Sequence, residues 1–419
     1  MRLLKSILLI LFAALVLFPL ASLSDRRAKP PTNYGLELAR IQKDIAELED
    51  KVFAPPVDID QTLKLLQRMY HRAQLTGAPA DLQSTEAAID RALREVGPLA
   101  GLYLLKANLN FKLHRLKQAD EDIAALSRFA GDPRIVVLRA GIDFQQGQYE
   151  AAKMGYLSAV EKNPTWDNLV RLAYWLGKFG DADLADRLYR QAEEDISAKE
   201  MRAYAWVELQ RGLLDLNRGR YDEALAHYRE AGKAYSGYWL VDEHVAELLG
   251  ATRKFDAAVS LYESVIARAP LPEHYQRLGD LYLFMGKPER ARPWHDKALA
   301  GYLDSVARGE VNYYHHLAGF FADVREDGAE AIKWAAKDRA LRPHFATQDA
   351  LAWGLYRAGR FEEARDVSRE ALASGVKDAH LFFHAGMIHL AAGRAEEGKE
   401  LLKKAGSINP GYENFHAHR

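Results

Sequence analysis

The sequence predicts an all-α solenoid, a stack of helix-turn-helix repeats, and three observations support this prediction. A small residue recurs along the chain at steps of 33, 33, 39, 34, 33, 40, 33 and 34, and a second small residue precedes each of these anchors by twelve positions. Proline follows several anchors by twelve positions, where it would end a helix. A base period of 33 to 34 residues with two insertions is typical of paired-helix repeats. The anchors are Ala119, Ala152, Ala185, Ala224, Ala258, Ala291, Ala331, Ala364 and Gly398.

Length and composition agree with an extended array and exclude several kinds of site. The chain has 419 residues, more than one compact core usually contains. Its 57 Lys and Arg against 58 Asp and Glu give a net charge of -1, so no overall attraction to nucleic acid is expected. The absence of cysteine excludes disulfides, cysteine-ligated zinc, thiol nucleophiles and an acylated lipoprotein cysteine.

The first element, residues 1–24, predicts an export signal or a membrane anchor. Arg2 and Lys5 precede an uncharged, mainly apolar run that extends to Ser24. That run is short for a membrane-spanning helix and long for a cleavable signal, so both alternatives stay open. We expect the body to lie outside the cytoplasm. It would be attached to the inner membrane with a periplasmic body, or free in the periplasm of the cell envelope if the signal is cleaved.

Residues 25–58 predict a tether followed by a short amphipathic helix. Ile41, Ile45, Leu48 and Val52 recur at spacings of 4, 3 and 4, which places them on one helix face. This face could form a coiled coil between two chains, or it could cover the first repeat, and the short length favours covering. Residues 59–98 then predict a degenerate first repeat, residues 99–412 the solenoid, and residues 413–419 a C-terminal tail.

Within each repeat, the small positions have a physical reason. If a unit is two antiparallel helices, the two small residues lie where the helices cross, and only Gly or Ala allows close approach there. Five residues before most anchors stands a glycine such as Gly359, which can end the first helix in a left-handed conformation. His114 and Arg253 replace this glycine in two units.

These positions resemble the tetratricopeptide repeat family, whose pattern has a small residue near position 8, glycine near 15, alanine at 20 and proline near 32. The segment "YQRLGDLYLFMGKPERARPWHDKAL" carries Leu278, Gly279, Tyr282, Gly286 and Ala291 in the family's positions. The resemblance covers about nine units, with residues 59–98 as a degenerate tenth. It implies a right-handed superhelix whose first helices line a concave groove.

The resemblance also implies that positions 2, 5, 9, 12 and 13 of each unit face this groove. The middle units present acidic residues there, and the C-terminal units present mainly aromatic ones. A partner segment with apolar anchors and basic residues would fit such a groove. The alternative is that the aromatics pack against neighbouring helices or against a folded-back C-terminal tail. The candidate groove residues are Glu243, Glu247, Asp280, Tyr313, His316, Phe320, Trp353, Tyr356, Arg357, His380, Phe383 and Met387.

Metal binding and catalysis have little support in the sequence. His380 and His384 are four residues apart and would share a helix face, but a metal needs three or four convergent ligands. Packed or solvent-facing histidines are the simpler interpretation. Because phosphate loops, nucleophile elbows and dinucleotide motifs are absent, we expect no cofactor, no metal and no enzymatic activity.

The sequence therefore predicts a non-catalytic scaffold that binds segments of partner proteins, with a role in assembling a cell-envelope complex. An uncleaved N-terminal segment would add the inner membrane as a second partner. The alternative function is an accessory subunit for synthesis or export of an envelope polysaccharide, which rests on fold analogy alone.

Overall fold

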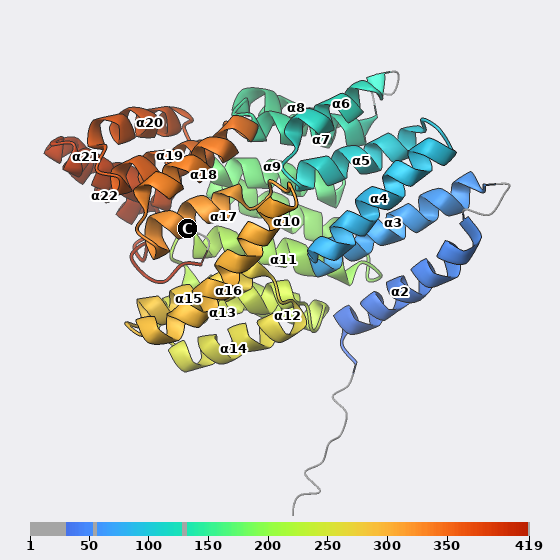
Figure 1. Ribbon diagram of the computed structural model, residues 1–419, viewed down its shortest axis with the longest axis horizontal. Coiled ribbons are helices and arrows are strands. Elements are labelled where there is room, and N and C mark those ends of the chain that lie inside the picture. The colour runs from blue at the N-terminus through green and yellow to red at the C-terminus, as the bar shows by residue number, and fades with distance from the viewer. Residues whose placement is uncertain (1–30, 53–56, 128–131, 418–419) are drawn as a thin grey trace, which may run out of the picture.

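Ten antiparallel helix pairs follow one preceding helix in the part of the chain that the structure describes (Figure 1). The structure is a computed structural model that describes residues 31–52, 57–127 and 132–417. The all-α repeat solenoid is confirmed. Its helices are α2 (Asn33–Val52), α3 (Ile59–Thr76), α4 (Pro79–Glu95), α5 (Ala100–Lys112), α6 (Leu116–Ala124), α7 (Pro133–Gln145), α8 (Tyr149–Lys162), α9 (Trp166–Lys178), α10 (Ala182–Asp195), α11 (Met201–Leu216), α12 (Tyr221–Ala234), α13 (Trp239–Ala251), α14 (Phe255–Arg268), α15 (Pro272–Phe284), α16 (Pro288–Ala307), α17 (Tyr314–Gly319) with the π-helix η2 (Phe320–Val324), α18 (Gly328–Leu341), α19 (Phe345–Arg357), α20 (Phe361–Ala373), α21 (Ala379–Ala391) and α22 (Ala395–Ile408).

Helix α2 covers the first helix pair. Ile41, Ile45, Leu48 and Val52 are all buried, and α2 packs against α3. Its apolar face is therefore already occupied within the chain, as in the covering alternative. The signal or anchor expected at residues 1–24 lies outside the described residues. Among the helices that the structure describes, none combines the length and the apolar character needed to cross a membrane.

The left-handed turn between the two helices of a unit occurs in all nine units. The residue five positions before each anchor has a positive φ in every case. Six of these residues are glycine, while His114, Arg253 and Glu326 adopt φ of 61°, 59° and 53°. The left-handed turn therefore also occurs at residues with a side chain, for which a positive φ costs free energy. Packing of the two helices determines the connection.

Glycine at the crossing position makes room for a large side chain on the second helix. A Cβ added at Gly212 would lie 2.2 Å from Cε1 of Tyr228, and one at Gly279 would lie 2.3 Å from Cδ2 of His295. Tyr228 and His295 each stand four residues after their anchor. The glycine on the first helix of the unit thus packs against the residue four positions after the anchor on the second helix, one turn further along.

Gly319 departs from the predicted crossing position. No atom lies within 4 Å of a Cβ added there, and the residue is only partly buried. The π-helix η2 begins at the next residue. Because a π-turn spans one residue more than an α-turn, it rotates the helix faces, and Ala318 and Phe320 are the buried residues here instead.

The superhelix closes on itself, because residues about 200 positions apart form hydrogen bonds. The amide N of Tyr34 donates to the carbonyl of Ser236 at 3.1 Å. Dividing separations of 190–203 residues by the period of 33 to 34 gives about six repeats per superhelical turn. Successive turns therefore touch. The pairs include Asn33 with Ser236, Gln145 with Arg342, Tyr149 with Phe345, Lys178 with Asp378, Leu216 with Asn409 and Tyr221 with Gly411.

Candidate functional site

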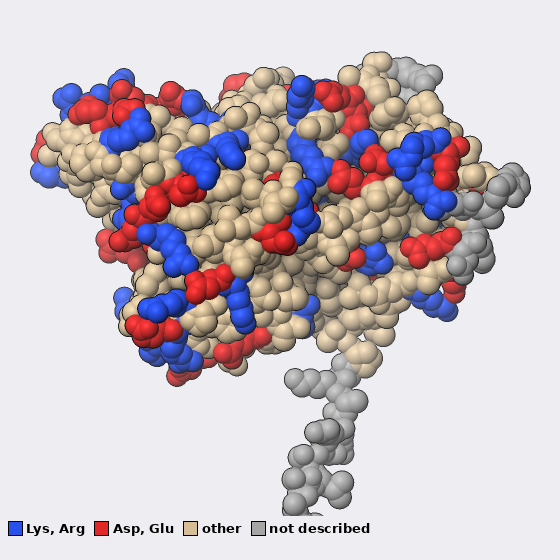
Figure 2. All heavy atoms as spheres, viewed as in Figure 1, with Lys and Arg blue, Asp and Glu red and all other residues tan. Residues whose placement is uncertain are grey.

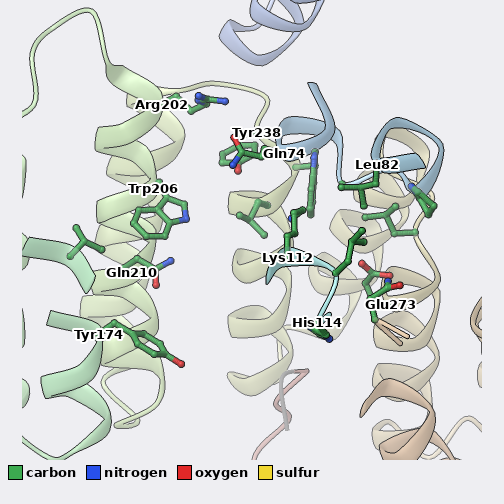
Figure 3. A pocket seen from close by; sticks show the side chains of 18 of the residues that line it. Gln74, Leu82, Lys112, His114, Tyr174, Arg202, Trp206, Gln210, Tyr238 and Glu273 are labelled. Carbon is green, nitrogen blue, oxygen red and sulfur yellow. The ribbon is translucent and has the colours of Figure 1, made fainter. Parts of the chain in front are cut away.

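The superhelix surrounds a central cavity of about 840 Å³ that is partly open to solvent. Its lining comes from α3, α4, α5, α8, α9, α11, α13 and α15 and from the loop before α17. Figure 3 shows Trp206, Gln210 and Tyr174 on one wall, with Lys112 and Gln74 across the open space. The volume falls within the range of about 300–1,000 Å³ that is usual for ligand sites.

One wall of the central cavity is aromatic and amide-bearing. Trp206 and Gln210 are four residues apart on α11, which places both on the face that looks inward. The ring of Trp166 meets that of Trp206 edge to face with 6.4 Å between centroids, and this contact fixes the indole of Trp206. This wall therefore offers a flat apolar surface beside amide donors and acceptors.

The opposite wall carries charge. Lys112 ends α5 with its ammonium exposed to the cavity, and within the described residues it forms no hydrogen bond or ion pair. Enclosure by protein lowers the pKa of Lys112, and the nearby carboxylate of Glu273 opposes that shift. Burial raises the pKa of Glu273, although its carboxylate accepts a hydrogen bond of 3.2 Å from the Tyr313 hydroxyl. The central cavity thus contains both a hydrogen-bond donor, the ammonium of Lys112, and an acceptor, the carboxylate of Glu273.

Contacts between successive turns hold the walls of this cavity together. The indole N–H of Trp239 on α13 donates to the carbonyl of Leu75 at 3.1 Å, and Gln83 on α4 donates to Glu310. Arg202, at the start of α11, contacts His71 on α3. The cavity therefore requires the whole superhelical turn, since its walls come from units that are distant in sequence.

A second, smaller cavity of about 290 Å³ lies where the C-terminal tail returns to the middle repeats. Phe415 is buried and meets Phe284 with 5.8 Å between ring centroids. The amide N of Ala417 donates to Oε1 of Glu247 at 2.6 Å. The C-terminal tail thus packs against α13 and α15.

The predicted groove residues are not gathered in one place. Tyr313 lines the central cavity, while His380, Phe383 and Glu247 line the second one. Glu243 and Phe320 have no exposed surface and so present nothing to a partner in this conformation. Glu243 instead forms an ion pair of 3.0 Å with Arg277 on the next unit.

The remaining predicted residues contact one another or neighbouring helices. Trp353 stacks on Tyr356 and on His384, with centroid separations of 4.6 and 3.9 Å. Arg357 pairs with Glu326 at 2.8 Å. His316 stacks on Tyr302, Asp280 accepts from His295 at 2.8 Å, and Met387 is partly buried on α21.

Several residues of the central cavity are absent from the sequence prediction. Lys112, Tyr174 and Trp206 occupy positions 13, 9 and 2 of their own units, which are the positions that were counted only in the middle and C-terminal units. The same count in earlier units would have found them. Gln210 falls outside that pattern and gives no comparable signal.

The outer surface carries charge of both signs. On the face shown in Figure 2, Lys and Arg side chains alternate with Asp and Glu over all visible parts of the solenoid. Many of these residues are paired along one helix, as in Lys333 with Glu330 at 2.9 Å. Such a surface agrees with the net charge of -1 and gives no long-range attraction to a polyanion.

The repeated helix pairs and the central cavity define a helical-repeat solenoid. The tetratricopeptide repeat family model matches residues 205–230 and 346–370. The chain is 28% identical over 139 residues to the TPR repeat-containing protein YpiA of Bacillus subtilis, a match that covers 33% of this chain. The chain thus spans 31% of the length of YpiA. Over the matched segments, the chain is similar to tetratricopeptide repeat proteins.

Solved structures of human, bacterial and yeast proteins are similar to this chain. The human IFIT1 dimer with PPP-AAAA gives a TM-score of 0.46 at 12% identity, covering 89% of this chain and 88% of that one. A tetratricopeptide repeat protein from Parabacteroides merdae gives 0.36 at 20% identity, with coverage of 59% and 94%. Yeast Tom70 gives 0.42 at 14% identity, with coverage of 89% and 92%.

Proposed function

We propose that the protein is a non-catalytic scaffold that binds an extended segment of a partner protein in the central cavity. The observation that supports this proposal is the mixed lining, with Lys112 as donor, Glu273 as acceptor and the amides of Gln74 and Gln210 able to be either. An extended peptide presents both N–H and C=O groups, and its side chains can stack on Trp206. Such a segment would satisfy the unpaired ammonium of Lys112 through a carbonyl or carboxylate oxygen.

This proposal requires Trp206 and Lys112 to make the main contacts with the partner segment. Aromatic side chains that are held rigidly in a cavity contribute most of the binding energy at many interfaces. Trp206 is held against Trp166, and Lys112 is the basic side chain of the cavity that lacks an ion-pair partner within the described residues. We expect removal of either side chain to weaken binding of the partner segment without disturbing the helix crossings.

A second candidate ligand is a polysaccharide, and the same wall favours it. Sugar rings stack on aromatic faces while neighbouring amides bind their hydroxyl groups, and Trp206 beside Gln210 offers this combination. This arrangement would suit the accessory subunit for envelope polysaccharide synthesis or export. A glycan would depend on Trp206 and little on Lys112, because a neutral sugar gains no ion pair.

We also propose that the protein acts in the cell envelope, in the assembly of an envelope complex. Residues 1–24 support this placement through their basic start and apolar run. If the segment stays uncleaved, it attaches the protein to the inner membrane with the body in the periplasm. Cell fractionation together with protease treatment of intact spheroplasts checks this. A chain in the soluble cytoplasmic fraction would contradict it.

The decisive experiment compares partner capture by three variants of the full chain expressed in its own host. Trp206→Ala and Lys112→Met are the test variants, and Lys403→Met on the exposed face of α22 is the matched control. We expect both test variants to lose the same protein and the control to keep it. Loss of a glycan with Trp206→Ala alone would favour the polysaccharide, and an unchanged set of bound molecules would place the binding surface elsewhere.

A further inference from the structure

Three side chains with metal-binding atoms converge beside the second cavity. Asp349 on α19 and His380 and His384 on α21 each place one ligand atom within 4.8 Å of the other two. The two histidines are separated by four residues and so share a helix face, and their ring centroids lie 3.9 Å apart. Asp349 supplies, from the preceding unit, the third ligand that the sequence analysis lacked.

One of the two carboxylate oxygens of Asp349 lacks a hydrogen-bond partner among the described residues. Its Oδ2 lies 2.8 Å from Nδ1 of His384. Its Oδ1 is buried and, within the described residues, has no hydrogen-bond partner. The side chain as a whole is only 10% exposed. An unsatisfied buried carboxylate oxygen is costly, and a cation at this point would satisfy it.

We propose that Asp349, His380 and His384 bind a first-row divalent transition metal ion, with Zn²⁺ as the test ion. Two imidazoles and one carboxylate form a ligand set that zinc uses in sites that keep a fourth position open. Zinc bonds to such ligands are about 2.0–2.1 Å long, so the ligand atoms must move closer together. His380 is partly exposed and stands in the first turn of α21.

Neighbouring residues hold the ligands in place. The ring of Trp353 stacks on His384 with 3.9 Å between centroids and an interplanar angle of 9°. Asp378 caps α21 by accepting from the amide N of His380 at 3.0 Å, and it pairs with Lys178 at 3.1 Å. Such contacts fix ligand orientation before the metal binds, which raises affinity.

The proposed site has an accessible side. His380 lines the second cavity together with Phe383 and His416. A metal held at this point would join α19 to α21 and could take its fourth ligand from water in that cavity. The proposal does not depend on the function proposed for the central cavity, because Asp349, His380 and His384 are not among the residues that line that cavity.

The test is titration of the full chain, produced without a histidine tag, with Zn²⁺ followed by calorimetry. We expect a single site in the wild type and at least tenfold weaker binding in His380→Gln and in Asp349→Asn. His389→Gln is the matched control, since His389 is a buried histidine on α21 that pairs with Glu397 instead. The control should bind as the wild type does.

A second measurement needs no variant. Histidine-selective modification of the wild type, read by mass spectrometry, should show His380 protected when Zn²⁺ is present and reactive when a chelator is added. Equal modification of His380 in both states would overturn the proposal, as would wild-type affinity in His380→Gln. Binding that disappears only when His416 and His418 of the tail are replaced would also overturn it.

Discussion

Gly212 stands where α11 crosses α12, and its hydrogen atom occupies the space that a methyl group would need. A Cβ there would lie 2.2 Å from the ring of Tyr228, which is itself buried. Gly212→Ala should therefore destabilise the protein by about 1–3 kcal/mol, because the ring or the helix must shift. Urea unfolding followed by circular dichroism measures the change.

Gly319→Ala on α17 is the matched control for Gly212→Ala. Its Cβ meets nothing within 4 Å, and its φ of -63° suits alanine. Alanine favours helix over glycine, so the stability should rise by up to about 1 kcal/mol. If both substitutions destabilised the protein equally, close approach of the helices would not explain the glycine at position 212.

Arg253 holds a left-handed conformation that costs a non-glycine residue free energy. Its φ is 59°, its side chain is exposed, and it occupies the turn position that glycine fills in six other units. Arg253→Gly should stabilise the protein by about 1 kcal/mol, measured by urea unfolding. The reverse exchange at Gly286, which has φ of 70° and open space around it, should destabilise it by a similar amount.

Individual residues of the turns and crossings could be predicted because they depend on local geometry. The nine turn positions all have positive φ, and the anchors are all buried. Gly319 could not be placed correctly, since a π-helix leaves no simple mark in the spacing of small residues. Asp349 occupies position 5 of its unit and His380 position 2 of the next, so their proximity follows from the repeat period only once the units are stacked.

At the scale of elements, the start of α19 depends on a buried neutral histidine. His344 caps α19 by accepting from the amide N of Ala346 at 3.2 Å. Burial, together with the positive charges of Arg342 and Lys178, lowers the pKa of His344 to about 3. Between that value and the ordinary 6.5, the unfolded chain binds a proton that the folded chain does not. The stability present above pH 6.5 is therefore lost as the pH falls.

His344→Asn should remove this part of the pH dependence. Asparagine can still cap α19 but does not titrate. We expect the variant to lose about 2 kcal/mol less stability than the wild type between about pH 7 and pH 5, measured by urea unfolding at each pH. Parallel stability curves for the two proteins would show that His344 is protonated in the folded state.

The two long steps in the repeat period have different structural causes, which the sequence alone could not distinguish. Between Ala291 and Ala331, the extra residues lengthen α16 to 20 residues and form the loop that carries Tyr313 to the central cavity. Between Ala185 and Ala224, they are divided between the connection from α10 to α11 and α11 itself, which has 16 residues.

At the scale of the whole molecule, contact between successive turns makes the solenoid more cooperative than a simple stack. In an open array each repeat contacts only its sequence neighbours, and stability is nearly a sum of local terms. Here the Tyr149 hydroxyl accepts from the amide N of Phe345 at 2.7 Å across one turn. The central cavity could not be predicted, because the sequence period gives the unit but not the number of units per turn.

Tyr149→Phe tests this cooperativity. Loss of the hydroxyl leaves the Phe345 amide without its acceptor, which should cost about 0.5–1.5 kcal/mol and speed hydrogen exchange at the start of α19. Tyr103→Phe is the control, since its hydroxyl forms no hydrogen bond in the part of the chain that the structure describes. Unchanged exchange in α19 would mean that the turns fold independently.

The contacts between successive superhelical turns also limit the gain or loss of whole repeats. An open solenoid can gain or lose one repeat at little cost, because only the two flanking interfaces must be remade. In this molecule an added unit would rotate everything after it by about one sixth of a turn. Asp378 would no longer lie over Lys178, nor Phe345 over Tyr149. The chain is therefore expected to tolerate loop insertions at the outer surface but to resist duplication of a unit, as a ring would.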